Sequence, residues 1–140
     1  MRVLFDTNVV LDQLLDREPF VEAAERLLSL VDTGALDGML CATTVTTIHY
    51  LASKTVGAPE AATYVRELLS IFDVAPVDRE VLRAASESGF SDYEDAVLCE
   101  AARAAGASAI VTRNGKDFTR SALPVFTPVE LLAALQAESG

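Results

Sequence analysis

The sequence predicts an α/β domain in three layers, with a mostly parallel sheet of four to five strands between helices. Short apolar runs alternate with helical patterns along the chain, the order typical of βα units. Half of the residues are apolar, yet there is no Trp and only 6% of the residues are aromatic. The core must therefore consist mainly of Leu, Val and Ala. A length of 140 residues predicts a single domain over residues 1–140.

The first half of the chain predicts two strands and four helices. Apolar residues at spacings of three and four mark the helices, Gly34 ends the second helix and Pro59 opens the fourth. The third is predicted as a helix despite its β-branched residues. The predicted elements are strand 2–6, helix 8–16, helix 19–33, strand 39–42, helix 44–55 and a helix from residue 59.

The second half predicts three more strands and three more helices. Asp78 is expected to cap the first of these helices, and Thr127 and Glu130 form a capping box with Pro128 at the first helical position. The predicted elements are strand 74–77, the helix after residue 78, helix 91–106, strand 109–112, a polar loop 113–121, strand 125–126 and the terminal helix.

Charge and cysteine usage narrow the function classes. The 21 acidic and 11 basic residues give a net charge of -10, which repels nucleic acid and disfavours a broad phosphate-binding face. Such a charge suits a site for divalent cations or a basic partner. No membrane span or signal peptide is predicted. Cys41 and Cys99 lie in apolar surroundings, which favours buried, reduced thiols in a cytoplasmic protein.

Asp6 is the first candidate site residue. It closes the apolar run Val3-Leu4-Phe5 and precedes a helix start. A carboxylate at the end of a buried strand loses water and needs a cation or hydrogen-bond donors in exchange. Ligands of open parallel sheets bind at this edge. We therefore expect Asp6 to lie in a ligand-binding or catalytic site at this edge of the sheet.

The start of helix 91–106 supplies further acids. Ser91 and Glu94 match a capping box, so capping of the helix does not require Asp92 or Asp95. Asp95 shares a stripe with small apolar residues farther along the helix, so we expect it to face the site rather than solvent.

The loop after strand 109–112 is the third contribution. Asn114 and Asp117 offer oxygen ligands, and Thr112 offers a hydroxyl. An Asn-Gly turn with an exposed acid is the simpler interpretation of this loop. Together, the three segments bring oxygen ligands to one sheet edge, which is the ligand type that Mg²⁺ or Mn²⁺ prefers.

Four ordered stretches resemble PIN domains: residues 6–12 (DTNVVLD), 92–96 (DYEDA), 110–118 (IVTRNGKDF) and 124–131 (PVFTPVEL). The resemblance covers essentially the whole chain. It implies a metal-dependent ribonuclease that holds Mg²⁺ or Mn²⁺ with acids and cleaves RNA with a metal-activated water. Bacterial single-domain members are often VapC-type toxins, so the resemblance also implies an antitoxin partner.

The resemblance also assigns roles to individual residues. Asp6 corresponds to the first metal-binding acid and Asp95 to the central one. Asn114 stands where many members have a further Asp, and Asp117 is close by. The supporting positions are Thr7 and Asn8, which would shape the loop after the first strand, and Thr112.

One position departs from the family pattern. The family usually has a Glu early in the helix after the second strand, but residues 42–50 contain no acid. The Glu position falls on His49, or near Thr47 if the register slips. Either exchange removes one negative charge from the site. Asp92 is the residue that could compensate, one turn before Asp95.

Three hypotheses follow. The first is an endoribonuclease in which Asp6, Asp95, Asp92 and Asp117 bind one or two ions. The second is a degenerate PIN-like module that binds RNA or protein with little or no turnover, since the usual Glu is missing. The third, a phosphatase-type hydrolase with Asp6 as nucleophile, lacks the second Asp two residues on.

Basic residues and partners complete the sequence-based expectations. The basic residues expected near the sheet edge are Arg17, Lys54, Arg113 and Lys116. Their small number predicts a small footprint on RNA. Apolar helices exceed what a small sheet needs, which predicts a homodimer, and no membrane partner is expected.

Overall fold

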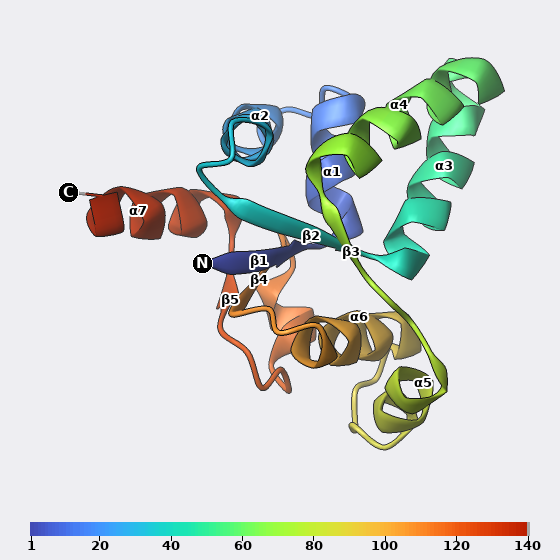
Figure 1. Cartoon of the computed structure of the whole chain (residues 1–140), viewed down its shortest axis with the longest axis vertical. Helices are drawn as coiled ribbons and strands as arrows, with labels where there is room; N and C mark the ends of the chain where they lie inside the picture. The colour runs from blue at the N-terminus through green and yellow to red at the C-terminus, as the bar shows by residue number, and fades with distance from the viewer. Residues whose placement is uncertain (140) are drawn as a thin grey trace.

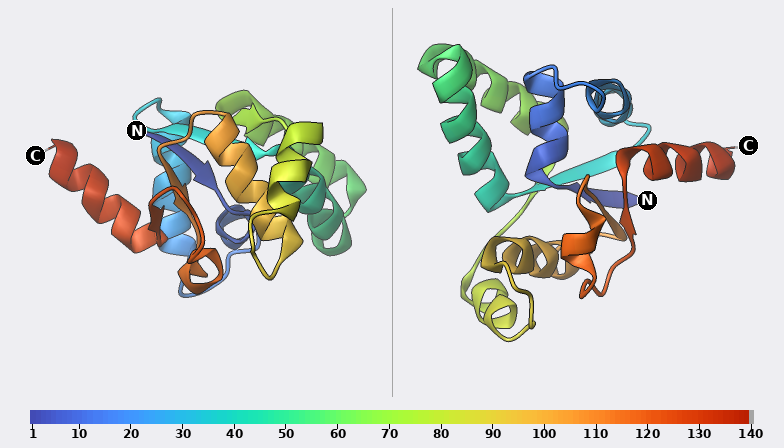
Figure 2. Two further views of the ribbon diagram at one scale, coloured as in Figure 1. Left: turned by 90° about the horizontal axis from the view of Figure 1, so that it is seen from below. Right: turned by 180° about the vertical axis from the view of Figure 1, so that it is seen from behind.

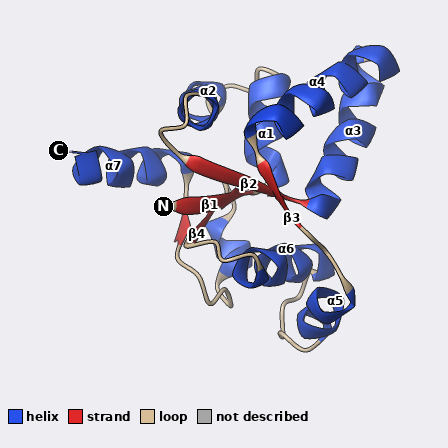
Figure 3. Ribbon diagram, in the orientation of Figure 1, coloured by secondary structure: helices blue, strands red, loops and turns tan. Residues whose placement is uncertain are grey.

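A five-stranded parallel sheet lies at the centre of the computed structural model, which describes residues 1–139 (Figure 3). The strand order is β3-β2-β1-β4-β5, so β1 is the central strand. The strands are β1 (Arg2–Phe5), β2 (Asp37–Cys41), β3 (Asp73–Ala75), β4 (Ala109–Val111) and β5 (Val125–Phe126). All four neighbouring pairs are parallel, which confirms the predicted fold class.

Helices cover both faces of the sheet (Figure 1). One face carries α1 (Thr7–Leu14), α2 (Val21–Asp32), α3 (Ala42–Val56) and α4 (Ala58–Ile71). The other carries α5 (Arg79–Ser86) and α6 (Tyr93–Ala104). A short 3-10 helix, η1 (Gly115–Phe118), precedes β5, and α7 (Pro128–Ser139) follows it. α7 packs against α2 and extends away from the sheet (Figures 1 and 2).

Alternate residues of β1 divide the core into two clusters. Val3 and Phe5 pack with residues of α1–α4 and with Leu131, whereas Leu4 packs with residues of α5 and α6. All three strand residues are fully buried, as expected for a central strand that is covered on both faces. The Phe5 ring meets the Phe72 ring edge to face at 5.1 Å. This packing fixes where β1 ends, and hence where Asp6 lies.

The predicted capping residue of α6 is wrong by one position. Asp92, and not Ser91, is the N-cap, and its carboxylate accepts a hydrogen bond from the Asp95 backbone N–H at 3.1 Å. Both residue types cap helices well, so the sequence alone did not fix the register. The expectation that capping does not require Asp92 is therefore wrong.

Other boundaries differ more modestly. The helix predicted over 44–55 begins earlier, at Ala42, and the loop predicted over 113–121 contains η1. The caps at Asp78 and at Thr127 with Glu130 are confirmed by their hydrogen bonds. Cys41 and Cys99 are buried and free, as predicted. None of the helices in residues 1–139 is long and apolar enough to cross a membrane.

Candidate active site

Asp6 and Thr112 lie side by side at the carboxyl edge of the sheet. Phe5 and Val111, which end β1 and β4, are register partners, so the residues that follow them meet. The Thr112 hydroxyl donates to one carboxylate oxygen of Asp6 at 2.7 Å, and the Thr7 backbone N–H donates to the other at 2.7 Å. Asp6 thus caps α1 and has a fixed orientation, as its place after a buried strand requires.

Burial opposes the ionisation of Asp6. Desolvation is the main reason why the pKa of its carboxyl is raised, and the nearby carboxylate of Asp117 raises it further. The hydrogen bonds from Thr112 and Thr7, followed by the charge of Arg113, act in the opposite direction. A second positive charge near Asp6 would therefore be favourable.

Asp95 enters the site from the first turn of α6. Burial raises the pKa of its carboxyl to about 7, and the charges of Asp92, Asp6, Asp117 and Glu94 add to the shift, in that order. Asp95 is half-buried, whereas Asp92 is exposed. Acids far apart in sequence therefore influence one another's ionisation: Asp6, which follows β1, Asp95 on α6 and Asp117 on η1.

The loop that follows β4 is tied to the same edge. Thr112 is fully buried, and its hydroxyl accepts hydrogen bonds from the Asn114 backbone N–H at 3.1 Å and from the Asn8 amide at 3.4 Å. The Asn114 side chain is exposed, and so is that of Asp117. Thr112 and Asn8 thus support the site through hydrogen bonds. Asp117 acts through its charge, which raises the pKa of Asp6 and of Asp95.

The α3 side of the site presents hydroxyl groups. The Thr7 hydroxyl donates to that of buried Thr44 at 3.0 Å. Thr47, one turn farther along, is half-buried and donates to the Thr43 carbonyl. His49 is exposed, and no described hydrogen bond or ion pair links its imidazole to the acids. Of the two candidate positions for the absent Glu, Thr47 thus lies nearer the Thr44 face of the helix.

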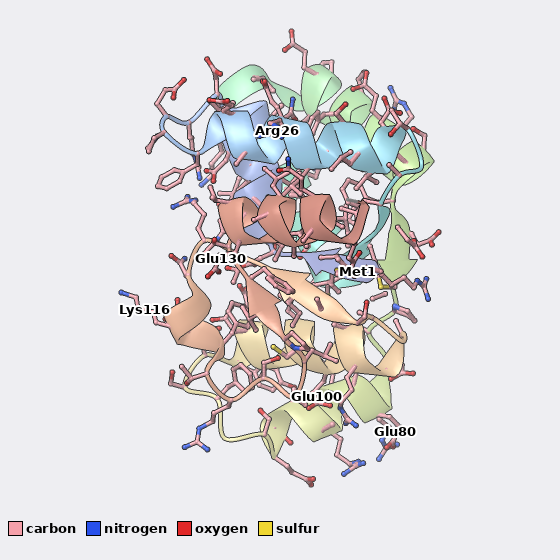
Figure 4. The ribbon with its side chains drawn as sticks, turned by 90° about the vertical axis from the view of Figure 1, so that its left-hand side faces the viewer. Met1, Arg26, Glu80, Glu100, Lys116 and Glu130 are labelled. Carbon is pink, nitrogen blue, oxygen red and sulfur yellow. The ribbon has the colours of Figure 1, made fainter. Side chains whose placement is uncertain are left out.

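Most of the expected basic residues have other partners. Arg113 makes a bidentate ion pair with Asp12, with N–O distances of 2.5 and 3.1 Å, and Arg17 lies 3.7 Å from the same carboxylate. Lys54 packs over the ring of Tyr50. Lys116 is exposed and points away from the body of the protein (Figure 4).

Asp12 is the important residue that sequence reasoning missed. It is fully buried on α1 although it is charged. The available signal was weak: Asp12 follows Asn8 by four residues, so the two side chains share a face of α1. Nothing local in the sequence pointed to a partner 101 residues away.

The available donors suit a hard divalent cation. They are carboxylate and amide oxygens. The thiol of Cys99 is not among them, because burial raises its pKa to about 12 and keeps it protonated. No group of three or more His, Cys, Asp or Glu side chains within residues 1–139 is arranged to hold a metal by itself. Carboxylate and amide oxygens are nevertheless the donors that hard divalent cations take, usually as one or two carboxylates beside several waters.

Comparison with known families agrees with this geometry. The sequence model of the PIN domain family matches residues 2–116. The chain belongs to the PIN domain family. No curated protein matches the sequence.

Several solved structures are similar to this PIN domain. VapBC-1 from nontypeable Haemophilus influenzae is 16% identical, covers 92% of this chain and 99% of its own, and has a TM-score of 0.70. FitAcB from Neisseria gonorrhoeae is 20% identical, covers 91% and 98%, and has a TM-score of 0.70. A toxin–antitoxin complex from Klebsiella pneumoniae is 23% identical, covers 90% and 97%, and has a TM-score of 0.67. At these identities the similarity establishes the fold.

Proposed function

We propose that this PIN domain is a divalent-metal-dependent endoribonuclease that acts as the toxin of a toxin–antitoxin pair. The observation that carries the proposal is the pair of carboxyls of Asp6 and Asp95, whose pKa values are raised mainly by burial and further by the repulsion of neighbouring acids. Mg²⁺ or Mn²⁺ would remove this repulsion. Membership of the PIN family and the fold shared with VapBC and FitAcB support the same assignment.

The residues of the site divide into holding and supporting roles. Asp6, oriented by Thr7 and Thr112, and Asp95 are the proposed ligands of the ion, with Asp117 and Asp92 acting directly or through water. A divalent cation there would supply a nucleophilic water at neutral pH and offset charge on a phosphate. Burial raises the pKa of the Asp95 carboxyl to about 7, so the group is partly protonated near neutral pH and cation binding would displace that proton.

Contacts with RNA would be few. Lys116 projects from the loop that carries Asn114 and Asp117, and is the cation best placed to meet a phosphate (Figure 4). Arg113 and Arg17 are committed to Asp12. With a net charge of -10, the protein would approach a short stretch of RNA rather than a long duplex.

An antitoxin is the proposed protein partner. A hollow of about 440 Å³ lies between α1, α2 and α4, and its lining contains exposed acids together with apolar residues. The acids are Glu25, Asp32 and Glu67, and the apolar residues are Leu28, Leu68 and Ile71. A basic amphipathic segment fits this chemistry. The homodimer remains a prediction, which light scattering of the purified chain tests.

A second candidate function has one specific observation in its favour. The α3 side of the site offers the hydroxyl of Thr44, and α3 contains no acid. One fewer carboxylate weakens the attraction for a cation, which suits a PIN-like module that binds RNA or protein without turnover. A phosphatase-type nucleophile at Asp6 is disfavoured, because both of its carboxylate oxygens accept hydrogen bonds.

The test is cleavage of a panel of structured and transfer RNAs by the purified protein with Mg²⁺, Mn²⁺ or EDTA. An Asp95→Asn variant is the matched control, because the exchange removes the charge and keeps the shape. We expect cleavage that needs the metal and is lost in the variant. Intact RNA in every metal condition, from folded protein without a bound partner, would favour the binding module.

A further inference from the structure

The Arg113 side chain is held by several contacts near the site. Its guanidinium donates two hydrogen bonds to Asp12 and lies over the Phe20 ring, 4.1 Å from the ring centroid. Its charge also lowers the pKa of Asp6. Arg113 is thus held from α1 and from the segment before α2, while its backbone begins the loop that carries Asn114 and Asp117.

Asp12, the partner of Arg113, is a buried acid. The Asp12 side chain is only 1% exposed, whereas that of Arg113 is 22% exposed. Burying such a pair costs desolvation free energy, and well-packed apolar residues of similar volume often give equal or greater stability. Stability alone therefore does not explain an acid at this position.

Asn8 and Asp12 act on the same loop from one face of α1. The Asn8 amide donates to the Thr112 hydroxyl, and its oxygen accepts from the Arg113 backbone N–H at 3.4 Å. One turn farther along, Asp12 holds the Arg113 side chain. α1 itself begins at Thr7, and Asp6 caps it. One rigid helix thus sets both Asp6 and the start of the loop.

We propose that Asp12 is a positioning residue, which orients residues 112–117 through Arg113 and so sets the distance between Asp6 and Asp117. This inference rests on the proposed nuclease for its catalytic readout only. The position of the loop and the affinity for a cation are independent of RNA cleavage.

Two variants separate positioning from stability. Asp12→Asn leaves Arg113 without an anionic partner, and we expect both lower stability and Mn²⁺ binding weaker by ~10–100-fold, as for other residues that orient metal ligands. The double variant Asp12→Asn with Arg113→Gln removes both charges. We expect it to recover stability, because no unpaired charge remains buried, but not to recover Mn²⁺ affinity.

Three measurements are made on each variant: urea unfolding, calorimetric titration with Mn²⁺, and hydrogen exchange of the peptide over residues 112–118. Faster exchange should be confined to the loop amides that are now hydrogen-bonded, those of Arg113, Asn114 and Asp117. In the cleavage assay kcat should fall ~10–100-fold with little change in KM. Glu87→Gln, which removes an exposed ion pair with Arg83, is the control and should change none of these values.

Two results would overturn the inference. The first is a double variant that regains both stability and wild-type Mn²⁺ affinity, and the second is unchanged loop exchange in both variants. If even the wild-type protein fails to cleave RNA, the proposed function fails, but loop exchange and Mn²⁺ affinity still decide the role of Asp12. If the wild type does not bind Mn²⁺ either, loop exchange alone decides it.

Discussion

Replacing Asp95 by Asn should stabilise the metal-free protein at high pH. The folded protein raises the pKa of this carboxyl from 3.8 to about 7, with burial as the main cause and the neighbouring acids as the next. The folded state therefore binds a proton more tightly than the unfolded state does. The resulting stability is fully present below pH 4 and is lost as the pH rises through 7. Asn has the same shape and carries no charge to lose.

The magnitude follows from the two pKa values. A rise from 3.8 to about 7 corresponds to ~4 kcal/mol if each pKa unit contributes ~1.4 kcal/mol. Asp95 is only half-buried, so water and salt screen part of this energy, and we expect ~1–2 kcal/mol. At pH 8 in EDTA, Asp95→Asn should therefore unfold at a higher urea concentration than the wild type.

The assay is urea unfolding of both proteins at pH 5 and pH 8, in EDTA and in Mg²⁺. The difference between the proteins should be larger at pH 8 in EDTA than at pH 5, and Mg²⁺ should reduce it at pH 8. Glu22→Gln, in the first turn of α2 and exposed, is the control and should have little effect. Equal stability of the two proteins at pH 8, with the same pH dependence, would refute the reasoning.

Three further predictions concern the site and its support. Thr112→Val removes the hydroxyl that donates to Asp6 and should destabilise the protein by ~1–3 kcal/mol; the loss, measured by urea unfolding, should be larger at pH 8 than at pH 5. Gly38→Ala places a Cβ 2.8 Å from two core side chains and should cost ~1–3 kcal/mol by overpacking; an unchanged melting temperature would contradict this. Thr47→Glu should tighten Mn²⁺ binding more than His49→Glu does, because Thr47 is half-buried and His49 is exposed; calorimetry showing the reverse order would place the missing acid at His49.

The convergence of Asp6 and Thr112 follows from sequence because the signal is local. Each residue comes directly after an apolar run, and parallel strands bring their carboxyl ends to one edge. The family pattern then placed Asp95 near them, and the electrostatic coupling of the acids agrees with that placement. The cap of α6 was harder to predict, because Ser91 and Asp92 are both good capping residues, and the choice between them depends on packing of the helix.

The role of Asp12 could not be predicted by the same reasoning. An acid at this point of a short helix usually faces solvent, and only the folded chain brings Arg113 to it across 101 residues. The pairing of Arg113 with that acid is non-local, which is why Arg113 was expected only as a basic residue near the sheet edge. Arg17, by contrast, lies close to Asp12 in sequence, just after α1. Sequence reasoning thus predicted which acids lie near one another, but it did not predict the ion pair between Asp12 and Arg113 that holds the neighbouring loop.

The most direct test of the central claim is the rate of RNA cleavage as a function of Mn²⁺ concentration, measured beside the Mn²⁺ binding isotherm of the same protein. A metal held by Asp6 and Asp95 predicts that the two curves share one midpoint, and that Asp6→Asn and Asp95→Asn shift or abolish both. Cleavage that persists in EDTA, or that survives in Asp95→Asn while Mn²⁺ binding is lost, would contradict the account.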